Sequence, residues 1–407
     1  MSEHPEIIFA ALMIFVYGLF SKLADRSPIT APMVFVATGI AVGPLGLGLF
    51  DIDVRGDLVH ILTEVTLILI LFVDASTINL RQLIQDRAIP IRMLGVGLPL
   101  TMLFGTVVAY LLYPELSIWL LLLMALILSP TDAALGQAVV KSEKVPERVR
   151  RWISVESGLN DGIALPPIFA CIAALSVGHA AAEETRWFIF LLQQIIFGAL
   201  IGGFVGWVGG VLVNTFANKG WMNSTFQRLV SGSLAILCFA FAELVHGNGF
   251  IAAFAGGLML GLGARTEHIR ERIQEFGEAE GQQLILFVFL IFAMLMVPKA
   301  VEYWDARAWI YALLSLTVIR MVPVAISLIG KQLDIKTILF VGWFGPRGIA
   351  SVLYLLLVVA ELGLQGYEQI LSVIVLTVLL SVFLHGISAV PLSNRYGKVF
   401  GSTVEVS

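Results

Sequence analysis

Long apolar runs recur along the whole chain, and they restrict the fold more than any other feature of the sequence. Each run has roughly 17 or more residues, which is enough for a helix to cross about 30 Å of hydrocarbon. The 407 residues are 58% hydrophobic and only 13% charged, whereas soluble domains carry about 25% charged residues. The sequence therefore predicts an all-α polytopic protein with the lipid bilayer as its surroundings. Thirteen spans are predicted, at 7–23, 30–48, 57–77, 90–112, 116–141, 150–177, 186–214, 227–245, 248–264, 279–298, 308–330, 337–360 and 368–391.

These spans are expected to form one integral membrane domain over residues 1–407. The N-terminal run has no basic segment and no small-residue cleavage site before it, so we expect a retained span rather than a signal peptide. Only a short tail is expected after the last span. Cys171 and Cys238 lie in different spans without disulfide or metal spacing, which indicates packing residues.

The distribution of Lys and Arg predicts the orientation of the chain. Nineteen of the 25 lie in loops after odd-numbered spans or in the C-terminal tail, and four lie after even-numbered spans. Because cytoplasmic loops are enriched in Lys and Arg, we expect an outside N-terminus and a cytoplasmic C-terminus in the cell (inner or plasma) membrane. The same rule accounts for the basic segment KSEKVPERVRR, so we assign it no ligand and expect no nucleic-acid partner.

Six charged residues fall inside predicted spans, where charge is rare and usually functional. They are Asp74, Asp132, Glu156, Asp161, Arg320 and Arg347. Asp161 lies about eleven residues into its span, or roughly 16 Å at 1.5 Å per residue, which is the middle of the bilayer. The same count places the Thr131–Asp132 pair near mid-span, together with Arg320 and Arg347. Four helices therefore bring polar residues to one depth, which predicts a binding site.

Two of these spans contain helix breakers beside their polar residues. One reads ILSPTDAALG around Pro130, and the other reads VGWFGPRGIAS around Pro346. Proline removes a backbone donor and glycine loosens a helix, so both spans are expected to be kinked or unwound there. The two spans are seven apart, and this odd offset predicts inverted repeats, 7–177 and 227–391, joined by a linker span, 186–214. Paired broken helices in inverted repeats are typical of transporter binding sites.

The segment SVESGLNDGIALPP carries most of the polar residues of one span. At 100° per residue, Ser157 and Asp161 share one helix face, whereas Glu156 and Asn160 share the adjacent face. A buried carboxylate needs a paired cation or must be neutral, and Arg320 is the predicted partner of Glu156.

Two intramembrane arginines cannot neutralise four acids, so at least two carboxylates remain to bind protons or cations. Hard cations take oxygen ligands, which the carboxylates, the hydroxyl groups of Ser157 and Thr131 and unwound backbone carbonyls supply. Asp132 and Arg347, each beside a break, can complement helix-end dipoles. The histidines near predicted interfaces are expected to be solvated rather than proton relays: His60, His246 and His385.

At these residues the chain resembles the monovalent cation/proton antiporter superfamily, in its NhaP-like branch of sodium/proton exchangers. SVESGLNDGIAL resembles the Glu-Ser-x-x-Asn-Asp signature of that branch, and LSPTDAAL resembles its Thr-Asp segment on a broken helix. Further similar segments are GIAVGPLGLGLF, LILFVDASTINLRQL and GWFGPRGIAS, spread over most of the chain in family order.

The resemblance implies a role for each polar residue. Asp161 would be the carboxylate that binds the proton and the cation in turn. The residues implied to complete or support the cation shell are Asp132, Ser157, Thr131 through its backbone, Asn160 and, through water, Asp74. The implied structural residues are Glu156, Arg320 and Arg347. The family often has two glycines after the third-span acid, whereas here Ala75 and Ser76 follow Asp74.

The expected function is antiport of Na⁺ or another monovalent cation against H⁺. Competition of the two ions for Asp161 couples their gradients, and the amide of Asn160 in place of a second acid implies electroneutral 1:1 exchange. A homodimer with a mobile six-helix core is implied by the resemblance alone. We expect no enzyme activity and no cofactor apart from the transported ions.

Three other classes of function are alternatives to antiport. A cation channel would need a continuous pore, and the sequence contains no repeated carbonyl filter. A non-transporting scaffold would leave the convergence of four polar helices unexplained. Cation-coupled symport of a small organic anion on a similar inverted-repeat fold is the main alternative.

Overall fold

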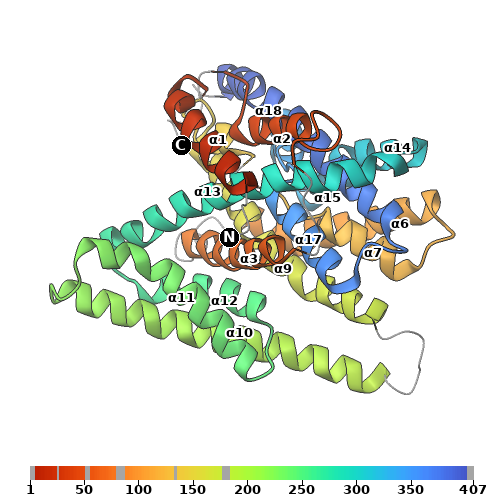
Figure 1. Cartoon of the computed structure of the whole chain (residues 1–407). Helices are drawn as coiled ribbons and strands as arrows, with labels where there is room; N and C mark the ends of the chain where they lie inside the picture. The colour runs from red at the N-terminus through yellow and green to blue at the C-terminus, as the bar shows by residue number, and fades with distance from the viewer. Residues whose placement is uncertain are drawn as a thin grey trace. The chain divides into compact units, whose positions relative to one another are not determined.

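The computed structural model describes residues 5–24, 27–50, 56–78, 88–132, 135–176 and 184–400, and this part of the chain consists of helices and loops (Figure 1). The predicted all-α fold is confirmed. In chain order the helices are α1 (Pro5–Ala24), α2 (Ala31–Val42), α3 (Asp57–Thr77), α5 (Ala88–Arg92), η1 (Met93–Gly97), α6 (Leu98–Leu112), α7 (Ile118–Ile127), α8 (Gln137–Val140), α9 (Glu147–Ser176), α10 (Glu184–Asn218), α11 (Ser224–Leu244), α12 (Gly249–Gly263), α13 (Glu267–Ala300), η2 (Val301–Tyr303), α14 (Ala306–Leu316), α15 (Val318–Ser327), α16 (Ile335–Trp343), α17 (Ile349–Leu362) and α18 (Glu368–Phe400).

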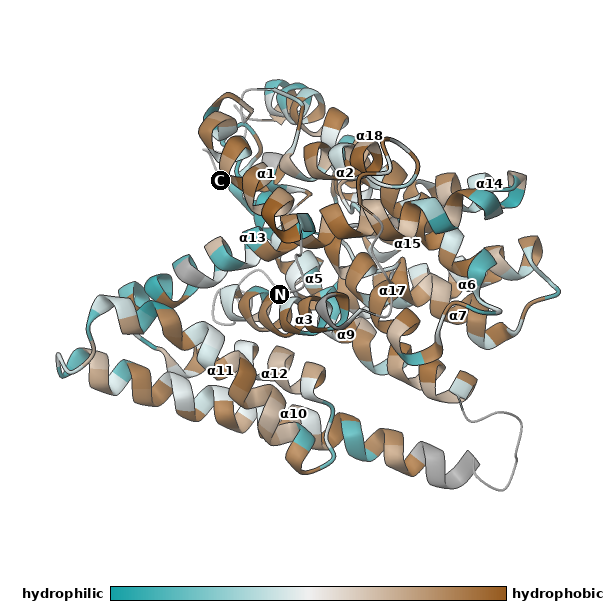
Figure 2. Ribbon diagram, viewed as in Figure 1, coloured by the Kyte–Doolittle hydropathy of each residue, from teal (hydrophilic) through white to brown (hydrophobic). Residues whose placement is uncertain are grey.

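Nine helical segments among the described residues are long and apolar enough to cross a membrane, and four shorter apolar helices accompany them. Each predicted span overlaps at least one of the observed helices, although the number of membrane crossings itself stays a prediction. Figure 2 shows hydrophobic residues along the lengths of these helices. On α1 the side chains of Ile8, Leu19 and Leu23 are 71%, 66% and 67% exposed, and a lipid environment would cover such apolar surface.

Within the residues that the structure describes, four predicted spans are interrupted. The two predicted breaks are present, because α7 and α16 end just before Pro130 and Pro346. Two further interruptions were not predicted. The fourth span contains a π-helical turn, Met93–Gly97, just ahead of Pro99, and the eleventh span breaks at Thr317, whose φ and ψ of −118° and −93° separate α14 from α15.

The chain divides into two compact units. Unit 1 comprises Met1–His60, Ala88–Ser157 and Ile285–Ser407, and unit 2 comprises Ile61–Arg87 and Gly158–Leu284. Helix α9 runs through the point of division, so it contributes residues to both units. These units are groups of residues that pack together, whereas the predicted inverted repeats are defined by the direction in which the chain crosses the membrane. The assignment of the repeats therefore stays a prediction.

Small residues bring α10 and α12 together in unit 2. Gly202 and Gly206, one turn apart on α10, approach the backbone of Ala252 and Gly256 on α12 so closely that an added Cβ would overlap it. Small residues at four-residue spacing allow membrane helices to pack backbone against backbone. This explains why the seventh and ninth spans are rich in glycine.

Helix α18 is the buried centre of unit 1. It packs against α7, α8 and α17, which carry parts of the two broken spans, and against α2 and α14. Its contacts with α16 are both aromatic and polar: the rings of Phe340 and Tyr396 stack with their centroids 4.2 Å apart. Trp343 Nε1 donates to Ser388 Oγ at 3.0 Å, and the hydroxyl oxygens of Thr337 and Tyr396 lie 2.7 Å apart. The broken segments are therefore anchored on one continuous helix.

Candidate functional site

The two broken spans of unit 1 are tied to each other at their breaks. Oδ2 of Asp132, beside the first break, accepts the backbone N–H of Ile349 at 2.8 Å, just after the second break. Conversely, Nη1 of Arg347 donates to the carbonyls of Ser129 at 2.7 Å and Pro130 at 3.2 Å. Asp132 is 5% exposed and Arg347 is fully buried, so these bonds form away from water.

These contacts satisfy backbone groups that the ends of broken helices leave open. Helix α17 begins at Ile349, so the carboxylate of Asp132 lies at its positive end. The guanidinium of Arg347 binds carbonyls just after α7, at the negative end of that helix. The predicted complementation of helix ends by these two charges is therefore present. The Ser351 hydroxyl adds a bond of 2.7 Å to the Ile127 carbonyl.

The glycines around the second break are required by the close approach of two charged side chains. A Cβ on Gly348 would overlap the carboxylate of Asp132, and a Cβ on Gly345 would lie 2.5 Å from Nε of Arg320. Between them, Pro346 has no N–H to leave unsatisfied, and its carbonyl accepts the N–H of Asp132 at 2.9 Å. The Gly-Pro-Arg-Gly sequence thus fits the backbone between two charged groups.

Helix α9 brings its polar residues to the same region of unit 1. Oγ of Ser157 lies 3.0 Å from Oγ1 of Thr131, beside the first break. Glu156 forms a bidentate ion pair with Arg320 of α15, with Nη1–Oε1 and Nη2–Oε2 distances of 2.5 and 2.7 Å. Both side chains are 2% exposed. The predicted pairing of this acid and this arginine is confirmed.

The next turn of α9 belongs to unit 2 and carries Asn160 and Asp161, which are 0% and 5% exposed. Helical spacing places Asp161 on the face of Ser157. Asp74 is partly buried on α3, and its backbone carbonyl lies beside Gly158 of α9, 3.4 Å from where a Cβ would be. Within unit 2, α3 therefore packs against α9 at the level of the signature segment.

Six of the nine predicted site residues are in direct contact with one another or with the two breaks in unit 1, and three lie in unit 2. Their ion-binding roles remain predictions. Among the residues that the structure describes, no group of three or more His, Cys, Asp or Glu side chains is arranged to hold a metal ion.

The histidine predictions were right for two residues and wrong for the third. His60 and His246 are exposed, as expected near membrane interfaces, but His385 is 1% exposed. The error arose because α18 continues to Phe400, which places His385 well inside the helix instead of near its end.

His385 connects the second break to α18. Its Nε2 lies 3.0 Å from the carbonyl of Trp343 at the end of α16, and its Nδ1 lies 3.2 Å from Oγ of Ser381. The same Ser381 oxygen accepts the backbone N–H of Arg347 at 2.7 Å. Because a carbonyl only accepts, Nε2 is the donor to Trp343, and Nδ1 also lies 3.2 Å from the carbonyl of Ser381. The i, i+4 spacing of Ser381 and His385 was the sequence signal for this network.

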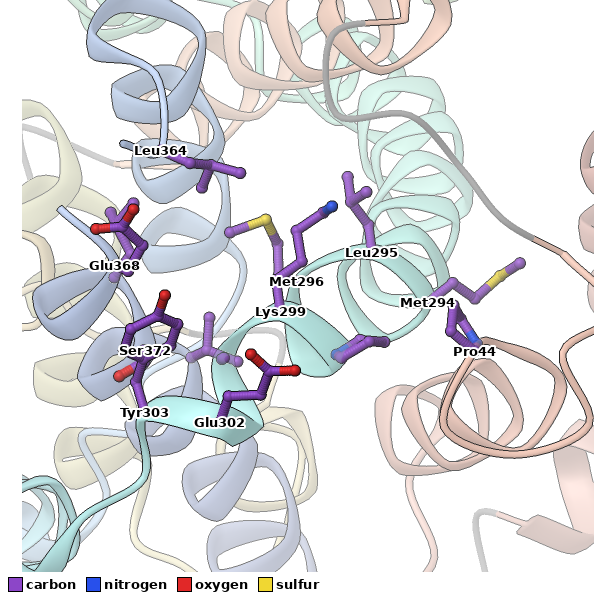
Figure 3. A pocket seen from close by; sticks show the side chains of 14 residues that line it. Pro44, Met294, Leu295, Met296, Lys299, Glu302, Tyr303, Leu364, Glu368 and Ser372 are labelled. Atoms are coloured by element: carbon purple, nitrogen blue, oxygen red, sulfur yellow. The ribbon is translucent and has the colours of Figure 1, made fainter. Parts of the chain in front are cut away.

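A cavity of about 440 Å³ opens elsewhere in unit 1, at the end of α13, along η2 and at the start of α18 (Figure 3). Three charged residues, Lys299, Glu302 and Glu368, line it together with Met294 and Met296. The nine predicted site residues are absent from its lining. This cavity is therefore distinct from the predicted cation site.

The sequence matches the family described as sodium/hydrogen exchanger, transmembrane, over residues 8–395. It is 27% identical over 357 residues to the K⁺/H⁺ antiporter NhaP of Alkalimonas amylolytica, covering 84% of this chain and 59% of that protein. It is 27% identical to the Na⁺/H⁺ antiporter 2 of Zygosaccharomyces rouxii, covering 85% of this chain and 44% of that protein. The chain thus spans about half the length of these relatives. A shorter Na⁺/H⁺ antiporter of Schizosaccharomyces pombe is 25% identical and is covered over 89% of its length.

The fold is similar to that of a solved structure, the sodium proton antiporter MjNhaP1 from Methanocaldococcus jannaschii at pH 8. The TM-score is 0.80 at 19% identity, and the match covers 96% of this chain and 98% of that chain. A second structure of the same antiporter gives a TM-score of 0.74 at 18% identity. At these identities the likeness establishes a common fold.

Proposed function

Because the chain belongs to the sodium/hydrogen exchanger family, we propose that it is a secondary antiporter that exchanges a monovalent cation for a proton across a membrane. The family match extends over 8–395, and the relatives described above are named as antiporters of K⁺ or Na⁺ with H⁺. Two features of the molecule support this: the apolar helices, and the buried polar residues at two broken spans.

The proposed ion-binding carboxylate is Asp161. The other acid of this part of α9, Glu156, is held by Arg320 in a bidentate pair, so its charge is compensated. Asp161 shares the helix face of Ser157, whose hydroxyl lies 3.0 Å from that of Thr131 beside a helix break. A buried acid one helical turn after Ser157 on the continuous helix α9 is the observation that carries the proposal.

A carboxylate of this kind binds either a proton or a cation, and this exclusion couples the two ion flows. The other proposed members of the shell are Asp132, Ser157, Thr131, Asn160 and, through water, Asp74. Oxygen ligands suit a hard cation. Since Asn160 is an amide where a second acid would carry another charge, we propose electroneutral exchange of one cation for one proton.

The proposed setting is the cell membrane, with the N-terminus outside and the C-terminus in the cytoplasm. The supporting observation is the concentration of Lys and Arg after odd-numbered spans. A homodimer is proposed from the family resemblance.

The symport alternative has no support from the comparisons, because the relatives described above are named as antiporters. It also makes a different prediction. A symporter of an organic anion would move no protons against Na⁺ in vesicles that contain only inorganic salts.

The test is proton flux in proteoliposomes made with the purified protein and loaded with a pH-sensitive dye. Gradients of Na⁺, Li⁺ and K⁺ are imposed in turn, without organic solutes and with chloride as the anion. We expect at least one cation to drive proton movement, and Asp161→Asn to abolish it while the variant remains folded by size-exclusion chromatography. Flux with none of the cations, or full flux in Asp161→Asn, would overturn the proposal.

A further inference from the structure

A second surface pocket, of about 480 Å³, lies in unit 1 between α16 and the end of α18. Its walls are largely apolar and aromatic, with Leu339, Trp343 and Phe344 on one side and Leu392 and Val399 on the other. Leu339 and Val399 are 49% and 43% exposed. The pocket therefore opens at the surface of two helices that are apolar enough to contact lipid.

Two cations, Lys336 and Arg395, also line this pocket, and both are exposed. Neither takes part in the ion pairs formed among the described residues. The acid nearest in sequence, Asp334, caps α16, because its Oδ1 accepts the backbone N–H of Lys336 at 2.7 Å. The pocket thus combines an apolar wall with two cationic side chains that are available to an anion.

The cations and the apolar wall lie at different levels along the helices. Lys336 is in the first turn of α16, whereas Trp343 is seven residues further on, about 10 Å along the axis. Arg395 lies near the end of α18. Thr337 in the first turn of α16 contacts Tyr396 near the end of α18, so the start of α16 lies beside the end of α18. Both cations therefore lie at one end of this antiparallel pair of helices. By the distribution of Lys and Arg this is the cytoplasmic side, where anionic lipids concentrate.

We propose that this pocket binds an anionic membrane phospholipid, with its phosphate between Lys336 and Arg395 and an acyl chain along Leu339, Trp343 and Leu392. The charge of the headgroup matches the two cations, and the chain matches the apolar wall. Basic pockets between membrane helices are suited to lipid headgroups. A bound lipid adds an ionic bridge between α16 and α18, beside the Trp343–Ser388 hydrogen bond, and so steadies the segment that precedes the second break.

The test is lipid binding to the purified full chain in detergent, measured by native mass spectrometry. The probes are phosphatidylglycerol and phosphatidylcholine with identical acyl chains, and inorganic phosphate alone. We expect phosphatidylglycerol to be retained in preference to phosphatidylcholine. The double variant Lys336→Gln/Arg395→Gln should bind it about 30-fold more weakly, since each cation near an anionic lipid contributes about 1 kcal/mol.

A matched control changes two nearby cations that do not line the pocket, Lys331→Gln/Lys398→Gln, and should bind phosphatidylglycerol like the unchanged protein. A second variant, Leu392→Trp, fills the apolar wall without altering charge and should also weaken binding. If the charge variant fails to fold, Leu392→Trp still tests whether the pocket binds the lipid.

Three results would overturn the proposal. The first is equal retention of phosphatidylglycerol and phosphatidylcholine. The second is an equal loss of phosphatidylglycerol binding in the two double variants. The third is binding of inorganic phosphate alone that is as strong as binding of the lipid. Because the measurement is lipid binding, its failure would leave the antiport proposal untouched.

Discussion

Arg347 and Asp132 each stabilise the helix end that the other's broken span leaves open. Arg347 donates to the carbonyls of Ser129 and Pro130 after α7, and Asp132 accepts the N–H of Ile349 at the start of α17. The bond between Asp132 and Ile349 joins positions 217 residues apart in the chain. Both charges therefore have a structural role before any ion is bound, and loss of either should first be measured as loss of stability.

The first prediction separates the acceptor role of Asp132 from its charge. Asp132→Ala leaves the N–H of Ile349 buried without an acceptor, which should cost about 1–3 kcal/mol. Asp132→Asn keeps an oxygen that can accept this bond, so it should be less destabilising. Thermal unfolding in detergent measures the stability of both variants. Asp334→Ala is the control, because Asp334 caps α16 at an exposed position and water can replace the hydrogen bond that it accepts. Equal melting temperatures for the Ala and Asn variants would refute the acceptor role.

The second prediction concerns the space beside Asp132. Gly348→Ala introduces a Cβ that overlaps the carboxylate, so either the second break or Asp132 must shift. We expect cation-driven proton flux to fall at least tenfold while the helical content measured by circular dichroism is retained. Gly18→Ala is the matched control, because a Cβ there meets nothing within 4 Å. Normal flux in Gly348→Ala would show that transport tolerates this displacement of the second break or of Asp132.

The third prediction tests the buried ion pair of Glu156 and Arg320. Removing one partner leaves a buried charge uncompensated, which costs about 3–5 kcal/mol. Glu156→Gln and Arg320→Gln should each lower the melting temperature strongly, whereas the double variant should lose less than the sum. Additive losses in this cycle would mean that the pair contributes no coupling energy.

The sequence predicted the parts of the site that local chemistry determines. Proline and glycine located the two breaks, and the need of a buried carboxylate for a paired cation indicated Arg320 as the partner of Glu156. The i, i+4 rule placed Ser157 and Asp161 on one face of α9. These features depend on residue type and spacing, which a sequence displays directly.

Other features depend on long-range packing that spacing does not display. The break at Thr317 has no proline or glycine; on its two sides α14 packs mainly against α18, and α15 packs mainly against α16 and α6. The burial of His385 depends on the length of α18, which continues beyond the predicted span to Phe400. The reciprocal contacts of Asp132 and Arg347 were foreseen only as helix-end chemistry, because the bonding partners lie more than 200 residues away.

The fourth prediction concerns His385. His385→Phe removes the bond to the Trp343 carbonyl at the end of α16, which then keeps only the backbone N–H of Gly345 at 2.8 Å, and this should cost about 1 kcal/mol. His385→Gln retains an N–H donor of similar reach and should lose less. Thermal unfolding is again the measurement, and His60→Phe, at an exposed position, should change little. Equal melting temperatures for the Phe and Gln variants at position 385 would mean that this hydrogen bond does not contribute to the free energy of unfolding.

The last prediction is that Na⁺, or whichever cation drives flux, competes with H⁺ at Asp161. Below the pKa that this carboxylate has in the cation-free protein, one proton must leave for each cation that binds. The apparent dissociation constant should then rise tenfold for each unit by which the pH falls, and it should level off above that pKa. Under symmetric conditions transport should be bell-shaped in pH, because acid solution removes the charged carboxylate and alkaline solution removes the protons.

Calorimetric titrations of the purified protein at four or more pH values measure this competition directly. Heat from proton release should depend on the ionisation enthalpy of the buffer, and its size should approach one proton per cation at the acid end. Asp161→Asn should bind no cation at any of these pH values, whereas Glu64→Gln, on α3, should retain the pH dependence. A cation affinity that is the same in acid and neutral solution would exclude a carboxylate shared by the two ions, and with it the mechanism proposed for this site.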